Sequence, residues 1–521
     1  MAEQPGKKKA PKGHLTRRAS LNSVAAALVY VSRLLVGFVV NPILVAGLGS
    51  YAYGVWQVLG RLMGYMSAAG GRPSQALKWS IANRQLSSEI DEKRRQVGSS
   101  LIVAVLFLPI LIPVGAIIAW LAPAWLDAPA DMVAPIRLAT AILVTNLILI
   151  NFVTVPQSVL EGENLGYKRM GLSILLVLVG GGLMVVAVEL GAGLPGVTLA
   201  KLVITLLTGV TFYYIVKRYV PWFGIRRPSL SETRWFLGLS WWFLAWRLVG
   251  QVLRSGDVVV LGIADSPELV SVYALTRFVP ETLVGIVLMV VMGVAPGLGG
   301  LIGSGKTAKS AQVRSEIMTF SWLLSTLAGV GILLWNRSFV GLWVGEEFYA
   351  GELANLLIVI LVIQFVLVRN DSHIIDLTLD LKNKVLLGAL ASLLSVALAT
   401  GFVVVLDGGI VGLCAGFLIG RGLLSILYPA MVGRILGIGL VGQLRRAVRP
   451  ATATVVLFAL ALLASRRLDA DTWIQFIGVS IATVVVVGPV AFFTGLDRDN
   501  RNLLTTRVIR VVETFRTGRG S

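Results

Sequence analysis

Arginine side chains interrupt long apolar stretches of this chain at five positions that suit the binding of an anion. The guanidinium is planar and permanently charged, and its fork of N–H donors matches phosphate and carboxylate oxygens. At membrane depth such a group is costly, so it faces a packed interior or a water-filled cavity rather than lipid. Arg33 and Arg61 have no acidic residue in their own apolar segments, so any carboxylate partner must come from elsewhere. We therefore predict an anion-binding cavity lined by Arg33, Arg61, Arg247, Arg254 and Arg277.

Two acidic residues close to these arginines leave a structural alternative open. Asp257 follows Arg254 by three residues and Glu281 follows Arg277 by four, spacings at which side chains meet on one helix face. Each pair is interpreted either as an intrahelical ion pair or as part of the cavity. In the second case Asp257 and Glu281 take a coupling or gating role.

Three further charged residues in the apolar segments are candidates for coupling or gating. Arg369 and Asp371 lie two residues apart in one segment, and Arg421 lies at the centre of another. Asp371 is interpreted as the partner of Arg369 or as the carrier of a coupling ion, H+ or Na+. No other cofactor is expected, because one cysteine, Cys414, and two histidines are too few for a metal site.

The bulk composition identifies the surroundings of these charges. Of the 521 residues, 56% are hydrophobic and only 14% are charged, which is far too apolar for a soluble protein of this length. Apolar runs long enough to cross a bilayer about 30 Å thick recur along the chain. The fold class is therefore predicted to be all-α, a polytopic membrane protein.

Fourteen spans account for the apolar runs. They are expected at about residues 21–46, 52–77, 97–121, 133–157, 170–189, 194–216, 235–263, 269–297, 315–335, 352–377, 384–406, 409–431, 450–465 and 473–494. The spans fall into a first half, 21–216, a second half, 235–431, and two additional helices, 432–494. Residues 1–20 and 495–521 are predicted to be basic cytoplasmic tails, the first disordered, and residues 217–234 a cytoplasmic linker.

The distribution of positive charge orients the spans. Of the 46 Lys and Arg residues, almost all of those outside the spans fall in the tails and in alternate loops on one side. The loops on the opposite side hold only Arg337, Arg466 and Arg467. By the positive-inside rule both termini are expected in the cytoplasm. The net charge of +19 is thus explained by topology, and no nucleic-acid partner is expected.

One short stretch matches a nucleotide-binding motif but is better explained as a connector. Residues 300–307 match the P-loop pattern GxxxxGK[ST], but a nucleotide site also needs a preceding buried strand and a soluble helix. Here the motif follows one apolar span and stands just before the next, so we interpret it as a flexible connector. No loop is large enough for a catalytic domain, and no enzymatic activity is expected.

A faint repeat relates the two halves. In each, an arginine precedes a tight turn, an aromatic residue follows the turn, and a second arginine comes next. The members are Arg33, Leu48-Gly49, Tyr53 and Arg61 in the first half, and Arg254, Leu261-Gly262, Tyr273 and Arg277 in the second. Internal repeats in a membrane chain are typical of transporters whose site lies between the repeats.

The fourteen spans, the basic N-terminal tail, the central Arg33 and the pattern Leu48-Gly49-x-x-x-Tyr53-Gly54-x-Trp56 together resemble a known family. It is the polysaccharide-transporter branch (O-antigen and exopolysaccharide flippases) of the multidrug/oligosaccharidyl-lipid/polysaccharide (MOP) exporter superfamily. The resemblance implies two pseudo-symmetric six-helix bundles around a central cavity, two additional helices and alternating access. The related lipid II flippases place arginines in spans one, two and eight, where Arg33, Arg61 and Arg277 stand here.

The function implied by the resemblance is that of a flippase in the bacterial cytoplasmic membrane. Its substrate would be a polyprenyl-diphosphate-linked oligosaccharide for cell-surface polysaccharide synthesis. Its partners would be membrane lipids and the polysaccharide polymerase machinery. The glycan, the coupling ion and the oligomeric state stay open.

Three alternatives are weighed against this function. One is a lipid II-type flippase of the same superfamily. Another is a cation or drug antiporter, which predicts acidic residues deep in the first half, where the spans have none. The third is a polytopic glycosyltransferase or polymerase, which needs charged residues on a sizeable outside loop. The largest such loop, 336–351, offers Glu346 and Glu347 and little else.

Overall fold

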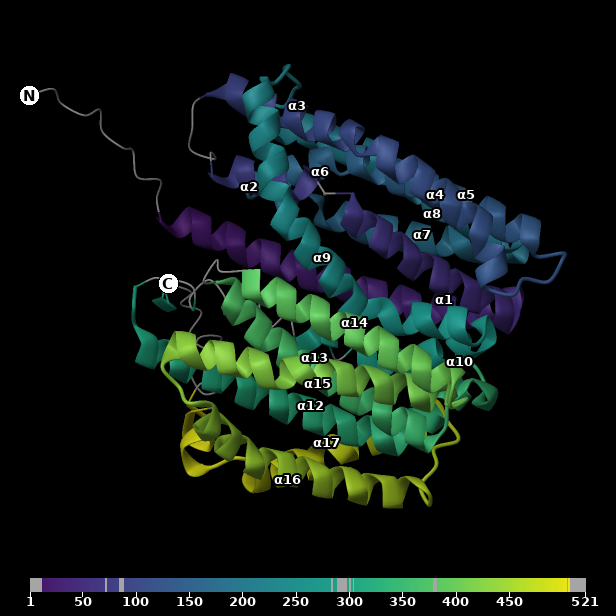
Figure 1. Cartoon of the computed structure of the whole chain (residues 1–521), viewed down its shortest axis with the longest axis vertical. Coiled ribbons are helices and arrows are strands. Elements are labelled where there is room, and N and C mark those ends of the chain that lie inside the picture. The colour runs from purple at the N-terminus through teal and green to yellow at the C-terminus, as the bar shows by residue number, and fades with distance from the viewer. Residues whose placement is uncertain are drawn as a thin grey trace, which may run out of the picture. The chain divides into compact units, whose positions relative to one another are not determined.

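The computed structural model describes residues 12–70, 73–83, 89–282, 284–287, 298, 301–302, 304–377, 382–503 and 505–506. Within these residues the secondary structure is helical and contains no strand, as the composition predicts. The chain divides into two compact units, each described by itself (Figure 1). Among the described residues, unit 1 comprises 12–49 and 62–247, and unit 2 comprises 50–61 and 248–506.

Unit 1 begins with α1 (Lys12–Ala69), which is one helix by its hydrogen bonds but two by its course. Gly49 has φ 80° and ψ 166°, a backbone conformation that glycine adopts without steric cost, and it breaks the helical path. The other elements of unit 1 are α2 (Pro73–Asn83), α3 (Ile90–Leu106), α4 (Leu108–Trp125), α5 (Val133–Val153), α6 (Val155–Gly162), η1 (Gly166–Arg169), α7 (Met170–Glu189), α8 (Gly193–Tyr219) and the first part of α9 (Leu230–Ala264).

A hydrophobic core holds α2, α3, α6 and α8 together in unit 1, with Ile81, Val159 and Val216 fully buried. The segment 217–234 packs at this end of the unit. Arg94 Nε donates to the carbonyl of Trp222 (2.8 Å), and the N–H of Arg226 donates to the carbonyl of Arg94 (3.2 Å). These bonds attach the segment predicted as a linker to unit 1, and the division between the units falls later, inside α9.

Unit 2 contains the rest of α9 and most of the second half of the chain. Its first helix after α9 is α10 (Pro267–Thr276), which is followed by a segment, Phe278–Val287, at an angle of 57°. The remaining elements are α12 (Thr307–Trp343), η2 (Glu346–Phe348), α13 (Glu352–Asp376), α14 (Lys382–Val404), α15 (Gly409–Leu436), α16 (Leu440–Ser465) and α17 (Trp473–Gly495).

Small residues let the helices of unit 2 approach closely. A Cβ at Gly416 would lie 2.4 Å from the Cα of Ala399, and one at Gly420 would lie 2.4 Å from the Cα of Ser395. Glycines one turn apart thus bring α15 against α14, the way helices commonly associate in membranes. The two additional helices, α16 and α17, pack along α12 through a separate apolar core (Figure 1).

Residues 50–61, the start of the second part of α1, pack inside unit 2 against α10. A Cβ at Gly54 would lie 1.7 Å from the carbonyl oxygen of Pro267, so only glycine fits there. Ser271 Oγ donates to the carbonyl of Ser50 (2.5 Å). Residues 50–61 from the first half of the sequence and α10 from the second half are therefore in close contact within unit 2. We call this contact the interlock.

The helices agree with the fourteen predicted spans. In the described part of the chain, 11 helices are long and apolar enough to cross a membrane, or 12 with the bent pair of α10 and Phe278–Val287. Counting α1 as two spans at Gly49, and adding α9, gives a helix for every predicted span. The end of the eighth span, 288–297, lies outside the described residues.

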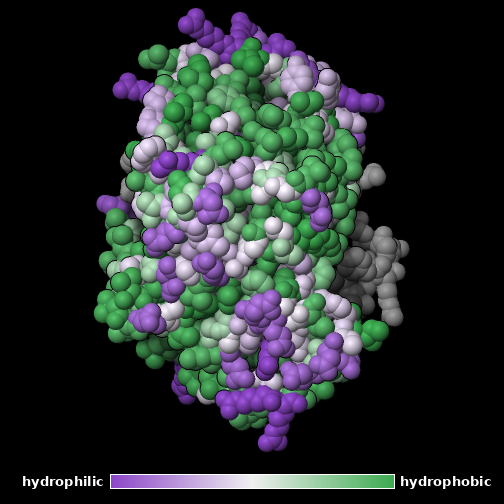
Figure 2. All heavy atoms as spheres, turned by 90° about the vertical axis from the view of Figure 1, so that its right-hand side faces the viewer, coloured by the Kyte–Doolittle hydropathy of each residue, from purple (hydrophilic) through white to green (hydrophobic). Residues whose placement is uncertain are grey.

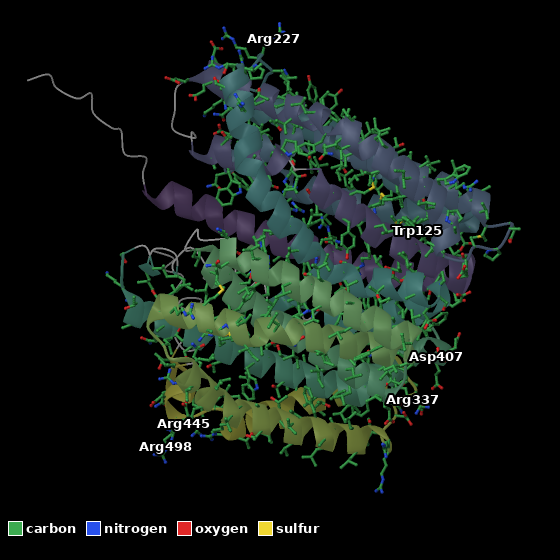
Figure 3. The ribbon with its side chains drawn as sticks, viewed as in Figure 1. Trp125, Arg227, Arg337, Asp407, Arg445 and Arg498 are labelled. Carbon is green, nitrogen blue, oxygen red and sulfur yellow. The ribbon has the colours of Figure 1, made fainter. Side chains whose placement is uncertain are left out.

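Four residues of unit 2 that were predicted in loops or tails on opposite sides lie at opposite ends of its helices. In unit 2, Arg445 and Arg498 lie at one end of the helices and Arg337 and Asp407 at the other (Figure 3). Between the ends, many large apolar side chains are exposed, among them Leu393, Val455 and Val485. Apolar residues also cover much of the face in Figure 2. Such a surface is expected where helices contact lipid.

Candidate functional site

Two buried tyrosines mark equivalent positions in the two halves of the sequence. Tyr53 and Tyr273 retain only 1% and 0% of their surface. One and two turns after Tyr273 stand Arg277 and Glu281, and the N–H of each bonds to the carbonyl four residues before it. The corresponding residues after Tyr53 are Gln57 and Arg61. When the two halves are aligned on the tyrosines, Arg61 corresponds to Glu281. The sequence repeat had instead paired Arg61 with Arg277.

Asp257 is the acceptor at the centre of a buried network in unit 2. Its Oδ2 accepts hydrogen bonds from Arg277 Nη1 and from the Tyr273 hydroxyl (2.9 Å), and its Oδ1 accepts from the N–H of Val258 (2.9 Å). Asp257 is 1% exposed and Arg277 is 8% exposed. The intrahelical Arg254–Asp257 pair therefore does not form, because Asp257 is used by a residue 20 positions further along the chain.

The hydrogen-bonded partner of Glu281 also lies on another helix, although Arg277 interacts with Glu281 electrostatically. Its carboxylate faces the guanidinium of Arg61, with Oε1 3.4 Å from Nη1 and Oε2 3.3 Å from Nη2. This pair joins residues 220 positions apart and supplies the partner that the first two spans lack. The pair is partly accessible: Arg61 and Glu281 keep 26% and 39% of their side-chain surface exposed.

Arg254 belongs to the same neighbourhood. Its side chain is exposed, Nη2 donates to Gln251 Oε1 (3.1 Å), and it interacts electrostatically with Arg61 and Glu281. We call Arg61, Glu281 and Arg254 the open cluster. Two guanidiniums share one carboxylate in it, so the accessible part of the site carries excess positive charge.

Arg421 occupies the buried side of the same helices. It is 2% exposed, and it donates from Nη2 to the carbonyl of Leu253 (2.5 Å) and from Nη1 to the carbonyl of Leu361 (3.2 Å). Its guanidinium also lies over the ring of Phe365, 5.3 Å from the centroid. These contacts join α9, α13 and α15, which makes Arg421 a brace between helices.

Asp371 pairs with Arg314 of α12. Arg314 Nε and Nη2 donate to Oδ1 and Oδ2 at 2.8 and 2.9 Å, a bidentate bridge between two buried side chains. Neither sequence interpretation of Asp371, a pair with Arg369 or an ion carrier, foresaw this bridge. Arg369 is half-buried and interacts electrostatically with Asp376 and Arg254.

Arg33 and Arg247 belong to unit 1. Arg33 is exposed on α1 and interacts electrostatically with Arg169, while Arg247 is half-buried on α9. Unit 2 thus brings together Arg61, Arg254 and Arg277 with both acidic residues. The convergence of Arg33 and Arg247 with them stays a prediction.

The roles of two residues of the site were not predicted from the sequence. Arg314 lies where a loop was predicted, and nothing in the local sequence connects it with Asp371, 57 residues away. Tyr273 was noted only as an aromatic residue in the repeat, although its hydroxyl holds Asp257. The spacing of four between Tyr273 and Arg277 was the available signal, since it places both on one helix face.

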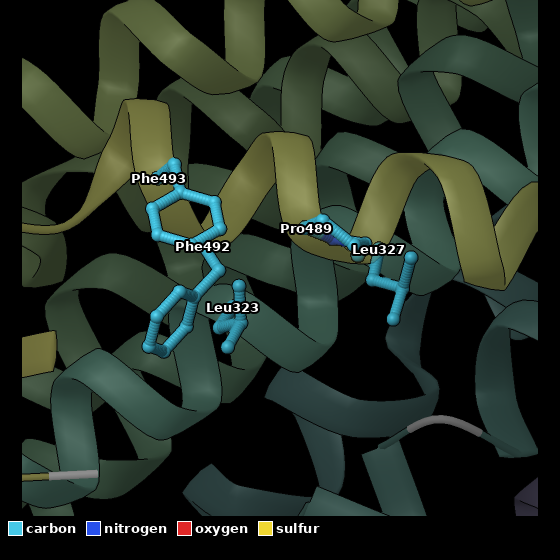
Figure 4. A pocket seen from close by; sticks show the side chains of 6 residues that line it. Leu323, Leu327, Pro489, Phe492 and Phe493 are labelled. Atoms are coloured by element: carbon cyan, nitrogen blue, oxygen red, sulfur yellow. The ribbon is translucent and has the colours of Figure 1, made fainter. Parts of the chain in front are cut away.

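Two other features bear on what the molecule binds. A pocket of about 380 Å³ lies between α12 and α17 and has an apolar lining (Figure 4). Its lining residues are Leu323, Leu327, Gly488, Pro489, Phe492 and Phe493. Among the described residues, no group of three or more His, Cys, Asp or Glu side chains forms a metal-binding cluster.

Comparison with solved structures places this geometry in a known fold. The chain is similar to the lipid II flippase MurJ in an inward closed conformation, with a TM-score of 0.66 and 14% identity over 90% of this chain and 97% of that one. It is also similar to an inward-facing multidrug resistance MATE family transporter of the MOP superfamily. That match has a TM-score of 0.64 and 17% identity, over 79% of this chain and 98% of that one.

The chain has the fold of the MOP-superfamily transporters. These structural neighbours are transporters and a flippase, not enzymes. A further match, MATE in the bent conformation, has a TM-score of 0.54 and 17% identity over 87% of this chain and all of the other. No family model matches the sequence. No curated protein matches it either.

Proposed function

We propose that this chain is a flippase that moves a polyprenyl-diphosphate-linked oligosaccharide across the bacterial cytoplasmic membrane for cell-surface polysaccharide synthesis. The observation that carries the proposal is the open cluster: two guanidiniums and one carboxylate that stay accessible within otherwise apolar helices. A diphosphate is a dense anion, and guanidinium forks bind its oxygens in pairs.

The surroundings of the cluster suit transport better than permanent binding. The cluster lies within apolar helices, where a lower local dielectric than that of water strengthens attraction between guanidinium and phosphate. Contacts of moderate strength let an ion leave the site as well as enter it. The apolar pocket between α12 and α17 offers a surface for hydrocarbon chains, as expected for a protein that handles a lipid.

The proposed cycle is alternating access, as the resemblance implies, with the sugar-linked diphosphate entering from the cytoplasm. The proposed orientation, from the positive-inside rule, has both termini in the cytoplasm. Single cysteines replacing Ala128 or Asp265 should react with an impermeant thiol reagent added outside, and one replacing the exposed Lys309 should not; Lys93 is buried and does not report on orientation. The native Cys414 is buried and does not interfere. The opposite labelling pattern would overturn the orientation.

The decisive experiment is deletion of the gene followed by analysis of the lipid-linked saccharides that accumulate, scored by leaflet. Accumulation in the cytoplasmic leaflet, reversed by the wild-type gene, is expected. Arg61→Ala should abolish complementation with the protein still inserted, and Arg61→Lys should restore it partly, because a point charge cannot reproduce the bidentate fork. Arg337→Ala, which removes an exposed arginine near the end of α12, is the matched control and should complement fully.

Other outcomes identify the alternatives. Accumulation of lipid II would assign the chain to cell-wall precursor transport, and unchanged lipids with increased drug sensitivity would assign it to drug efflux. Accumulation in the outer leaflet would point to a polymerase downstream of the transport step. The same Ala substitutions at Arg33 and Arg247 test whether unit 1 contributes to the binding of the diphosphate.

A further inference from the structure

The three interhelical ion pairs of the candidate site in unit 2 are built differently. Arg314–Asp371 has contacts of 2.8 and 2.9 Å with both side chains buried, and Asp257 binds Arg277 with Tyr273 as a second donor. Arg61–Glu281 has contacts of 3.3 and 3.4 Å, and both side chains are partly accessible. Charge-assisted hydrogen bonds are usually about 2.7–2.9 Å long, so Glu281 is held loosely.

We infer that Glu281 is a built-in counter-anion for Arg61 and Arg254, and that a diphosphate replaces it on Arg61 when substrate binds. This inference rests on the proposed function. It assigns Glu281 a specificity-determining role, because only an anion that outcompetes a carboxylate at two guanidiniums displaces it.

Charge balance supports the exchange. Asp257 pairs directly with Arg277, so Glu281, which also interacts electrostatically with Arg277, is the carboxylate that interacts with both Arg61 and Arg254. A diphosphate in a diester linkage carries two negative charges, which match the two guanidiniums. Bound there, it would leave Glu281 without a partner and repelled by the phosphate. The carboxylate therefore opposes tight binding and favours release of the substrate.

The backbone around Glu281 suits such a displacement. Arg277, at the 57° bend after α10, is fixed by Asp257, and Glu281 lies one turn beyond the bend. A pivot at the bend would move Glu281 away from Arg61 and leave the buried Asp257–Arg277 pair intact. Hinges of this kind are a common means of switching between conformations.

The test is binding of inorganic pyrophosphate to the purified full chain in detergent, measured by calorimetry for the wild type, Glu281→Gln and Glu346→Gln. Glu346 faces Arg337 at 4.0 Å on an exposed loop, so its substitution removes the same charge away from the cluster. We expect Glu281→Gln to lower the Kd for pyrophosphate about 2- to 5-fold, the range of a partly accessible ion pair, and Glu346→Gln to leave it unchanged.

Transport supplies the second readout. In reconstituted vesicles, Glu281→Gln should lower both KM and kcat for a polyprenyl-diphosphate-linked saccharide, because binding tightens while release slows. A residue with only a structural role would raise KM or lower the Tm. Should Glu281→Gln be poorly folded, Glu281→Asp retracts the carboxylate from Arg61 and should tighten pyrophosphate binding to a smaller extent.

The possible results separate the two claims. If the wild type binds pyrophosphate and Glu281→Gln binds it equally or more weakly, the counter-anion role is wrong and the flippase proposal stands. If neither protein binds pyrophosphate, the anion site at Arg61 is wrong; if deletion of the gene also leaves the lipid-linked saccharides unchanged, the proposed function itself is wrong.

Discussion

The two units differ in where their buried ion pairs lie. In unit 1, ion pairs gather near helix ends, among them Lys78–Glu161, Arg169–Glu161, Lys93–Glu163, Arg95–Glu232 and Arg226–Asp91. Unit 2 also has pairs at helix ends, such as Arg337–Glu346 and Arg466–Glu352, but in addition the pairs Asp257–Arg277, Arg61–Glu281 and Arg314–Asp371 connect different helices in buried or half-buried surroundings. Charge at helix ends meets water and headgroups, whereas charge within the helices must be matched by other protein groups.

The difference teaches which charges stabilise the fold and which are kept for another reason. A buried ion pair is often no more stable than well-packed apolar residues, while removing one partner leaves an uncompensated charge. Unit 1 avoids this cost for most of its pairs by placing them near the surface. Unit 2 accepts it, which is the reason to look for function in its buried and half-buried charges.

The largest expected effect comes from removing one member of the fully buried pair. Asp257→Ala leaves Arg277 charged and buried and Tyr273 without its acceptor, and should destabilise the protein by about 3–5 kcal/mol. Thermal unfolding in detergent measures it, with Asp469→Ala on an exposed turn as the control. Asp257→Asn combined with Arg277→Gln should recover part of the loss. A change below about 1 kcal/mol would break the comparison between the units.

A smaller effect is expected where the two sequence halves interlock inside unit 2. Gly54→Ala forces a methyl group against the carbonyl of Pro267 and should cost about 1–3 kcal/mol, because backbone cannot move aside as a side chain can. Gly60, two turns further along the same helix, has open space within 4 Å of the position that a methyl group would take. Gly60→Ala should therefore be neutral or slightly stabilising, since alanine favours helix more than glycine does. Equal changes in the free energy of unfolding at the two glycines would contradict the interlock.

Unit 1 supplies the next, weaker test. Arg95 and Glu232 are paired at 2.9 Å but about one-third exposed, so a double-mutant cycle with alanine should give a coupling of about 0.2–1 kcal/mol that falls with salt. The same cycle at Arg314 and Asp371 should give a larger, salt-insensitive coupling because both side chains are buried. Similar couplings at the two sites would remove the distinction between helix-end and buried pairs.

The smallest effect is expected at Lys306, an exposed charge at the start of α12. Gly305 has φ 71°, Lys306 precedes the first residue of α12, and both lie in a short turn. Gly300, the first glycine of the P-loop pattern, lies outside the described residues. Lys306→Ala should leave complementation of the deletion intact. A loss equal to that of Arg61→Ala, with the protein inserted, would revive nucleotide binding.

Much of the fold was predictable because membrane insertion leaves a strong local signal. Each span needs its own run of apolar residues, and loops need charge on one side, so span positions follow from composition alone. The helix ends were harder: α2 (Pro73–Asn83) and α9 (Leu230–Ala264) extend into regions predicted as loops. Polar helix ends outside the bilayer do not differ in composition from loops.

The sequence by itself determined which residues are unusual, because an arginine within an apolar span stands out without any structure. It determined neither the partner of Glu281 nor that of Asp257. Helical spacing favoured the nearest neighbours, Arg277 and Arg254, whereas the folded chain chose Arg61 and Arg277. Only tertiary structure decides this, because Gly54 brings residues 50–61 against α10 and places Arg61, 220 positions away in sequence, within reach of Glu281.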